Sequence, residues 1–398
     1  MGNKLLNLKI KNFRSFFNEQ TVSFNGNLDT NVSAIYGPNA SGKTNIARAL
    51  SFIKWFILNS TDVKVLKIPF EPFMLRSDND LPCELEIEFK NYDRSFRYGF
   101  SHKLDEIIEE HLIETTTQKD KVIFIRDHQT IVNSATASKF GFTDNLMKST
   151  LKTSLLITKK RPDNNQYSNA VFDFIGNFNI VTCDDKALRG LSIKLLKDNA
   201  DLKNKVVKYL QDADFGVRDL LIDDVEIPDD LIQNSPLNDV LKKQLRDSGK
   251  FVSISSKHYV RDKNRTKVGV AIFSFEDQES AGTNTMLDIA TLITYSIEKG
   301  APLYIDEFGS HLHSDLCRFI IEKFRSDDGK NAQIIVNTHD TSLMNFFKRE
   351  EIIFTQKNQA EESLITRLSE MSPRITDNFE KRYRDGLYGA KPFIKEVK

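Results

Sequence analysis

The sequence is poor in cysteine, and it has no long apolar run. Cys83, Cys183 and Cys317 are odd in number, widely separated and without metal-ligand spacing, so neither a disulfide framework nor a cysteine zinc site is predicted. No apolar stretch approaches the ~18 residues that a membrane-spanning helix needs. The N-terminus alternates like a strand and shows no signal-peptide core. We therefore expect a cytoplasmic protein with reduced thiols.

An excess of charge of one sign is also absent. Lys+Arg and Asp+Glu both number 56 among 398 residues, so no global field attracts nucleic acid or an anionic membrane, and such a partner needs a local patch. One basic stretch, at 242–267, carries Phe251 and Tyr259 among its lysines and arginines. It is compatible both with contact to a phosphate backbone and with a solvated hairpin, and the sequence does not separate the two.

What the chain does have is an alternation of strand and helix patterns. Apolar residues recur at every second position in 6–10, 84–89 and 94–101, which predicts antiparallel strands, with 21–24 as the partner of the first. The segments 32–36, 302–305 and 332–337 are short apolar runs that indicate buried parallel strands, and we expect another at 268–275. Helical spacing begins after Lys43 and near 314–325. The sequence predicts an α/β fold.

The segment "GPNASGKT" matches the phosphate-loop (Walker A) pattern between a predicted strand and a helix. In such a loop backbone amides surround the phosphates of ATP, the lysine reaches the β- and γ-phosphates, and the threonine hydroxyl binds Mg²⁺. The predicted nucleotide-binding residues are Gly37, Pro38, Asn39, Ala40, Ser41, Gly42, Lys43 and Thr44.

Two further segments supply candidate catalytic groups. The apolar strand "PLYI" ends in Asp306 and Glu307, the placement of a Walker B pair at the carboxyl edge of a parallel sheet. Asp306 is the candidate Mg²⁺ ligand and Glu307 the candidate general base for the attacking water. His339 follows the strand of "QIIVNTHD" and is a candidate sensor of the γ-phosphate, with a core or surface histidine as the alternative.

A second loop, "ESAGTN", precedes a long helix, but it has no lysine. With "LKIKNFRSF", "GPNASGKT", "IDEFGSHLH" and "NTHD", in this order, the sequence resembles the ABC-type ATPase superfamily, in the branch of RecF, SMC and OLD-like head domains. The resemblance implies that Ser280 and Gly282 contact ATP held by an opposite subunit, and that Gly309 to Leu312 form a D-loop. It also implies that Asn12 and Arg14 lie near the nucleotide.

The resemblance implies an ABC-ATPase head, which is a P-loop NTPase fold with a mixed sheet and an antiparallel β subdomain, here with an inserted, mainly helical subdomain. We expect residues 1–140 to form the N-terminal part of the head and residues 141–265 the helical insertion. Residues 266–398 then form the C-terminal part with its tail. The tail "RYRDGLYGAKPFIKEVK" either docks a partner or packs on its own domain.

Finer features resemble the RloA- and AbiLi-like antiphage ATPases, to which the ATPase of PARIS systems is related. These features are "IPFEPFML", "EIIEEHL", "ESAGTNTML" and "RYRDGLYGAKPFI". The resemblance implies a homodimeric or larger even-numbered assembly, no membrane partner, a phage protein or DNA as trigger, and a separate nuclease effector of the Toprim type. The alternative is a RecF-like repair ATPase that binds DNA directly.

Overall fold

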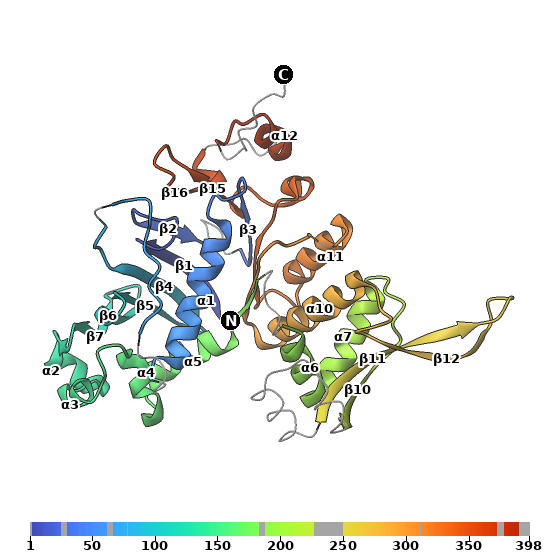
Figure 1. Cartoon of the computed structure of the whole chain (residues 1–398), viewed down its shortest axis with the longest axis horizontal. Coiled ribbons are helices and arrows are strands. Elements are labelled where there is room, and N and C mark those ends of the chain that lie inside the picture. The colour runs from blue at the N-terminus through green and yellow to red at the C-terminus, as the bar shows by residue number, and fades with distance from the viewer. Residues whose placement is uncertain are drawn as a thin grey trace. The chain divides into compact units, whose positions relative to one another are not determined.

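The computed structural model describes residues 2–24, 30–61, 67–77, 79–182, 188–226, 250–310, 312–371 and 378–389. The chain divides into two compact units. The first contains residues 1–183 and 296–398, and the second contains residues 184–295. Figure 1 shows the elements of both units.

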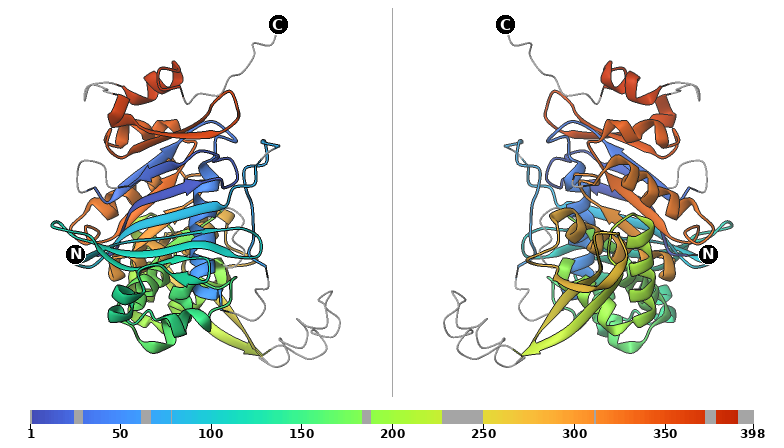
Figure 2. Two further views of the ribbon diagram at one scale, coloured as in Figure 1. Left: turned by 90° about the vertical axis from the view of Figure 1, so that its left-hand side faces the viewer. Right: turned by 90° about the vertical axis from the view of Figure 1, so that its right-hand side faces the viewer.

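The first unit contains a seven-stranded antiparallel sheet with the order β2-β1-β4-β5-β6-β7-β8. Its blue and cyan strands lie side by side in Figure 2. The burial of β4 alternates strictly between buried and half-buried residues, as its alternating sequence predicts for a sheet with one covered face. The strands are β1 (Lys4–Lys11), β2 (Gln20–Ser23), β4 (Cys83–Asn91), β5 (Arg94–His102), β6 (Ile107–Thr115), β7 (Lys121–Asp127) and β8 (Thr130–Ile131).

A six-stranded sheet with the order β16-β15-β3-β14-β13-β9 forms the second layer of this unit. All its neighbouring pairs are parallel except β15 with β16. The carboxyl ends of β3, β13 and β14 therefore meet at one edge, where ligands bind in open parallel sheets. The strands are β3 (Val32–Tyr36), β9 (Asn179–Val181), β13 (Pro302–Ile305), β14 (Gln333–Asn337), β15 (Ile352–Lys357) and β16 (Ser363–Arg367).

Helix α1 (Lys43–Asn59) contributes to one apolar core together with both sheets. Its apolar residues recur at helical spacing, so Ile46, Leu50, Ile53 and Ile57 form a buried face. The core fixes α1, and with it the loop that precedes it, between the layers. The other helices of this unit are α2 (Ser134–Ala137), α3 (Asp144–Lys148), α4 (Leu156–Lys160), α5 (Gln166–Asn177), α11 (Ser314–Arg325) and α12 (Phe379–Arg384), with 3-10 turns at Ser138–Phe140, Arg161–Asp163, Thr341–Phe346 and Leu368–Met371.

The second unit combines helices with a three-stranded antiparallel sheet of order β10-β11-β12. Arg189 of α6 forms an ion pair with Asp288 of α10, with Nε 2.9 Å from Oδ1, and thereby ties these helices together. The elements are α6 (Leu188–Asp198), α7 (Ala200–Asp212), β10 (Asp219–Glu226), β11 (Lys250–Arg261), β12 (Lys267–Ser274) and α10 (Ala281–Lys299), of which the last residues belong to the first unit.

The boundaries in the structure differ from the predicted insertion at 141–265. Helices α3 to α5 pack into the core of the first unit, where Phe174 stacks on Phe89 with ring centroids 4.3 Å apart. Their apolar faces are covered there, which is why they do not join the second unit. The insertion also contains strands β10 and β11. The segment at 268–275, expected as a buried parallel strand, forms the largely exposed antiparallel strand β12.

The other predicted strands and helices occur where their patterns place them. The pairs β1 with β2 and β4 with β5 are antiparallel hairpins, and α11 spans Ser314–Arg325. In the tail, the ring of Tyr383 stacks on Phe354 of β15, so residues 378–389 pack on their own unit, and residues 390–398 lie outside the described residues. Among the described helices, none is long and apolar enough to cross a membrane.

Candidate functional site

The phosphate loop connects β3 to α1, as the sequence predicts. Gly42, immediately before α1, has φ 109°, a left-handed conformation that favours glycine. A Cβ at Gly42 would overlap Ser363 Oγ. Ser363 Oγ in turn donates a hydrogen bond of 2.7 Å to the carbonyl of Ser41, and it lies at hydrogen-bonding distance, also 2.7 Å, from Ser15 Oγ. Hydroxyl groups from the β1–β2 connection and from β16 therefore hold the loop in place.

Lys43 turns back over this loop. Its Nζ donates hydrogen bonds to the carbonyls of Gly37 at 2.8 Å and Pro38 at 2.9 Å. Burial lowers the pKa of Lys43 to about 8, and the negative charges of Asp306 and Glu307 oppose this shift. The predicted Walker A lysine and the predicted acidic pair are therefore close enough to interact electrostatically.

Asp306 follows the last residue of β13, and its carboxylate is buried. Burial raises its pKa, whereas the hydroxyl of Thr44 lowers it. Oδ2 of Asp306 is buried and has no hydrogen-bond donor within the described part of the chain. A buried carboxylate oxygen without a donor fits a cation, since buried charges in proteins are paired or coordinate metals, and a hard cation such as Mg²⁺ takes oxygen ligands. Thr44 and Asp306 are therefore suitable residues to hold Mg²⁺.

Asn337, the last residue of β14, was not predicted as a site residue. Its side-chain amide donates a hydrogen bond to Asp306 Oδ1, and its Oδ1 accepts one from the backbone N–H of Glu307 at 3.2 Å. Glu307 itself is exposed and has φ 54°, a left-handed conformation that is uncommon for a non-glycine residue. Asn337 thus holds the backbone that presents the carboxylate of Glu307.

His339 lies two residues beyond Asn337, and its side chain is exposed at this edge. Partial burial of the ring and then the charge of Lys43 lower its pKa, while Glu307 raises it. His339 is therefore within electrostatic reach of both residues, and the lowered pKa favours its neutral form. A neutral imidazole can donate one hydrogen bond and accept another.

Asn12 is buried, and its side-chain amide is hydrogen-bonded to other residues of the chain. Its Nδ2 donates to the carbonyls of Leu81 at 2.7 Å and Pro82 at 3.2 Å. Its Oδ1 accepts from Phe73 N at 3.2 Å and Asn79 Nδ2 at 2.5 Å. The side chain thus uses all of its hydrogen-bonding groups on residue 73 and residues 79–82, and its place near the nucleotide stays a prediction.

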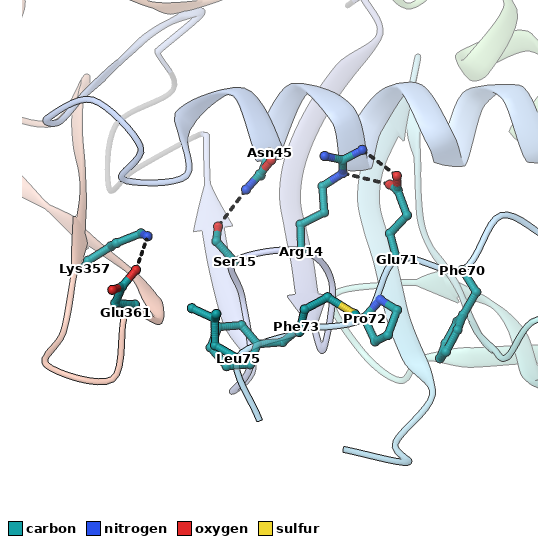
Figure 3. A pocket seen from close by; sticks show the side chains of 11 residues that line it. Arg14, Ser15, Asn45, Phe70, Glu71, Pro72, Phe73, Leu75, Lys357 and Glu361 are labelled. Atoms are coloured by element: carbon teal, nitrogen blue, oxygen red, sulfur yellow. Dashed lines mark hydrogen bonds and ion pairs between the residues drawn. The ribbon is translucent and has the colours of Figure 1, made fainter. Parts of the chain in front are cut away.

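Arg14 borders a recess near the start of α1. Its Nε and Nη2 donate to the two carboxylate oxygens of Glu71, at 2.8 and 2.6 Å, and Figure 3 shows this pair beside Asn45 and Ser15. The recess has a volume of about 460 Å³. One of the residues that line it, Asn45, follows Thr44 directly in α1. The recess is lined by Arg14, Ser15, Asn45, Phe70, Glu71, Pro72, Phe73, Met74, Leu75, Lys357 and Glu361.

The lysine-free loop lies in the second unit, at the start of α10. Ser280 Oγ accepts a hydrogen bond from Thr283 N at 3.1 Å and so caps the helix. A Cβ at Gly282 would meet only Ser280 Oγ, at 3.7 Å, so the backbone here is open to a close approach. In the predicted D-loop, Gly309 has φ 92°, and His311 lies outside the described residues.

Comparisons with known proteins agree with this architecture. Residues 32–345 match the family model described as "AAA domain, putative AbiEii toxin, Type IV TA system". The match covers more than half of the chain, including the phosphate loop, Asp306 and His339. No curated protein matches the chain.

Solved structures similar to the chain include heads of SMC proteins. An SmcHead bound to the C-terminal winged-helix domain of ScpA has a TM-score of 0.52 at 13% identity, and the match covers 92% of this chain and 99% of that one. An SMC head from Thermotoga maritima gives 0.44 at 16% identity, covering 92% and 98%. A Pyrococcus furiosus Smc head bound to the C-terminal domain of ScpA gives 0.46 at 13%, covering 93% and 98%. At these identities the likeness concerns the fold alone.

Proposed function

The chain belongs to this AAA-domain, AbiEii-type family, and on that premise we propose that it hydrolyses ATP and dimerises around two ATP molecules as the switch subunit of an antiphage complex. One observation carries the proposal. Lys43, Asp306, Glu307 and His339 follow the ends of three neighbouring parallel strands, where Asn337 hydrogen-bonds both Asp306 and the backbone of Glu307. Such a set suits binding of a nucleoside triphosphate and activation of water.

The proposed roles follow from the geometry of each residue. The amides from Gly37 to Thr44 surround the phosphates, and Lys43 exchanges its carbonyl partners for phosphate oxygens. Glu307 accepts a proton from the attacking water, and Asn337 keeps that carboxylate oriented. His339, neutral and near Lys43, hydrogen-bonds the γ-phosphate. Mg²⁺, held by Thr44 and Asp306, neutralises phosphate charge when bound.

The recess beside Arg14 is proposed to receive the base of the nucleotide. It contains apolar surface from Phe70 and Met74 beside polar groups from Asn45 and Arg14, the mixture found in small-molecule sites. This gives Arg14 a place near the nucleotide, as the sequence predicts, while Asn12 shapes the wall of the recess through the 73–82 segment.

Dimerisation is proposed from the loop at Ser280. An exposed helix N-terminus with a serine hydroxyl and an unobstructed glycine is suited to contact an anion, and this loop has no lysine of its own. We therefore propose that Ser280 and Gly282 act in trans, on ATP held by Lys43 of another copy. The D-loop from Gly309 to Leu312 is proposed to lie at the seam.

The proposed function includes a role in antiphage defence. The matched family's description names an AbiEii toxin, and the motifs of this chain resemble those of the RloA- and AbiLi-like ATPases. We propose that ATP turnover in the cytoplasm controls a separate Toprim nuclease, with a phage protein or DNA as the trigger.

Glu307→Gln tests the catalytic assignment. The substitution keeps size and hydrogen bonding but removes the base, so phosphate release should fall by about 10²- to 10⁴-fold while ATP binding and dimerisation on ATP persist. Glu276→Gln, on the exposed turn before α10, is the matched control. If Glu307→Gln released phosphate as fast as the unmodified protein, Glu307 would not be the base.

A further inference from the structure

Strand β12 carries an exposed apolar row. Val268, Val270 and Ile272 are 61%, 55% and 56% exposed, and because they alternate along the strand they share one face. Tyr259, 40% exposed, lies opposite Val270 on β11 and extends the same face. We name these four residues the β12 surface. A contiguous group of solvent-exposed apolar side chains is characteristic of an interaction site.

The backbone of β12 is open as well. Among the described residues β12 pairs only with β11 and is an edge of its sheet, so alternate N–H and C=O groups point away from the sheet without a strand beside them. Figure 1 shows the β11–β12 hairpin extending beyond α6 and α7 of the same unit. An extended chain segment can therefore pair with this edge.

The end of the hairpin is positively charged. Lys263 and Arg265 lie in the turn, and neither forms an ion pair with an acidic residue in the described segments. The one acidic residue of the turn, Asp262, is already used, since its carboxylate accepts hydrogen bonds from Asn264 N at 2.9 Å and Thr266 N at 2.8 Å. The turn therefore carries two cationic side chains against one carboxylate, and the β12 surface ends in net positive charge.

The opposite face of the hairpin contacts the loop at Ser280. His258 Nε2 lies 2.7 Å from Glu279 Oε1, and Ser256 Oγ donates to the same oxygen. Glu279 immediately precedes Ser280, the cap of α10. The carboxylate of Glu279 therefore connects the hairpin by hydrogen bonds to the residue that precedes the α10 cap.

From these observations we propose that the β12 surface binds an extended segment of a partner protein that has apolar side chains at alternate positions and acidic side chains at one end. The segment adds to the sheet as a strand, with its apolar residues on Val268, Val270 and Ile272 and its acidic residues at the basic turn. That this docking alters nucleotide turnover, through Glu279 and Ser280, rests on the function proposed above; the docking itself does not.

Two other occupants fit less well. Single-stranded nucleic acid binds by stacking bases on aromatic rings, but Lys267 Nζ lies 3.9 Å and Arg218 Cζ 5.1 Å from the ring centroid of Tyr259, and the remaining side chains of the surface are aliphatic. A second copy of the chain that paired through its own β12 would bring a strand without an acidic residue, and it would leave both basic turns without an acidic partner. An acidic, extended protein segment satisfies both the apolar row and the charge.

The test is a selection from a displayed library of random short peptides on the full-length protein without nucleotide. Peptides with apolar residues at alternate positions and acidic residues at one end should be enriched, and Val270→Asp should weaken their binding at least about tenfold. Lys263→Glu combined with Arg265→Glu should do the same. Val132→Asp, at an equally exposed valine of the first unit (63%), should leave binding unchanged.

The other outcomes overturn the proposal. Enrichment of peptides without acidic residues would contradict the proposed ligand. Binding that survives Val270→Asp would contradict the proposed binding surface. Binding of an oligothymidine that is lost with the charge-reversed pair but kept with Val270→Asp would make the turn a nucleic-acid site. Concentration-dependent dimerisation abolished by Val270→Asp would make a second copy the occupant. Because peptide binding is measured without ATP, and should be equal for Lys43→Met, its failure is distinguishable from a failure of the proposed ATPase.

Discussion

The side-chain amide of Asn337, at the end of β14, donates a hydrogen bond to the carboxylate of Asp306, just after β13. The same amide accepts a hydrogen bond from the backbone of Glu307. One residue of a neighbouring strand therefore fixes both the candidate Mg²⁺ ligand and the backbone of the candidate base. This arrangement connects the candidate metal ligand to the backbone of the candidate base.

Asn337→Ala should lower ATP turnover more than ATP binding. The substitution frees the backbone of Glu307 from its partner, and a positioning residue of this kind contributes to the chemical step when a small displacement misaligns the reacting groups. We expect phosphate release to fall by at least about tenfold. Steady-state kinetics should show a reduced kcat with little change in KM, and the exposed Asn145→Ala on α3 is the control. An equal loss from both variants would contradict a positioning role.

Asn337→Asp should make turnover dependent on pH in a defined direction. A carboxylate beside Asp306 adds to the effect of burial and raises the pKa of that carboxyl further. The deprotonated form that binds Mg²⁺ is then lost at higher pH than in the unmodified protein, so the acidic limb of the turnover profile should move to higher pH. Excess Mg²⁺ should reverse part of this shift. An unmoved limb would show that residue 337 does not act on Asp306.

ATP binding should take up protons at alkaline pH. The pKa of Lys43 is lowered to about 8 by burial, so at pH 8.5 the lysine is mostly neutral, and phosphate contact favours its charged form. Binding therefore raises the pKa and adds a proton at pH 8.5, but adds none from Lys43 at pH 6.5, where the lysine is already charged. Calorimetry in buffers of different ionisation enthalpy measures this uptake. Equal uptake at both pH values would contradict the role of Lys43.

The same shift predicts a stability effect. Burial in the folded protein lowers the pKa of Lys43 to about 8. Charging this lysine therefore destabilises the ligand-free folded protein, and the cost develops as the pH falls from the pKa of an unfolded lysine to about 8. Lys43→Met removes this cost, so the Tm of the ligand-free protein should rise below pH 8 and change less above pH 10. ATP should no longer raise the Tm of this variant. A Tm that falls equally at both pH values would indicate that packing, and not charge burial, dominates at residue 43.

Gly42→Ala should destabilise the loop. Gly42 has φ 109° and faces Ser363 Oγ, so a side chain introduces both backbone strain of about 1 to 2 kcal/mol and a steric overlap. Gly176→Ala in α5, where a Cβ meets nothing within 4 Å, should instead stabilise the protein by about 1 kcal/mol. Thermal denaturation distinguishes the two. Equal Tm changes would contradict the packing of the loop against β16.

The motifs predicted the centre of the site because each one lies directly after a buried strand. "GPNASGKT", Asp306 with Glu307, and His339 follow β3, β13 and β14, and parallel strands bring their carboxyl ends to one edge. Asn337 was missed although it ends a buried strand in the same way, because an asparagine has no titratable group to mark it. The only indication of Asn337 in the sequence was its place at the end of a buried strand.

Several features of the structure depend on tertiary contacts that local sequence patterns do not indicate. The strand at 268–275 is apolar enough to suggest burial, but its pairing with β11 leaves its apolar row exposed. Asn12 belongs to a recognisable motif, yet its hydrogen-bond partners lie about 60 to 70 residues further along the chain, where no local pattern indicates them. Helices α3 to α5 look separate in sequence and join the core only through contacts such as Phe89 with Phe174.

The central claim, that each ATP site is completed by a second copy of the chain, is tested most directly by mixing two inactive variants. Ser280→Arg and Lys43→Ala each disable both sites of their own dimers, whereas a mixed dimer regains one site that combines Lys43 from one copy with Ser280 from the other. In an equal mixture half of the dimers are mixed, so we expect about a quarter of the unmodified phosphate-release rate, if sites act independently. Native mass spectrometry confirms that mixed dimers form. If they form and phosphate release does not exceed that of the separate variants, the composite site is contradicted.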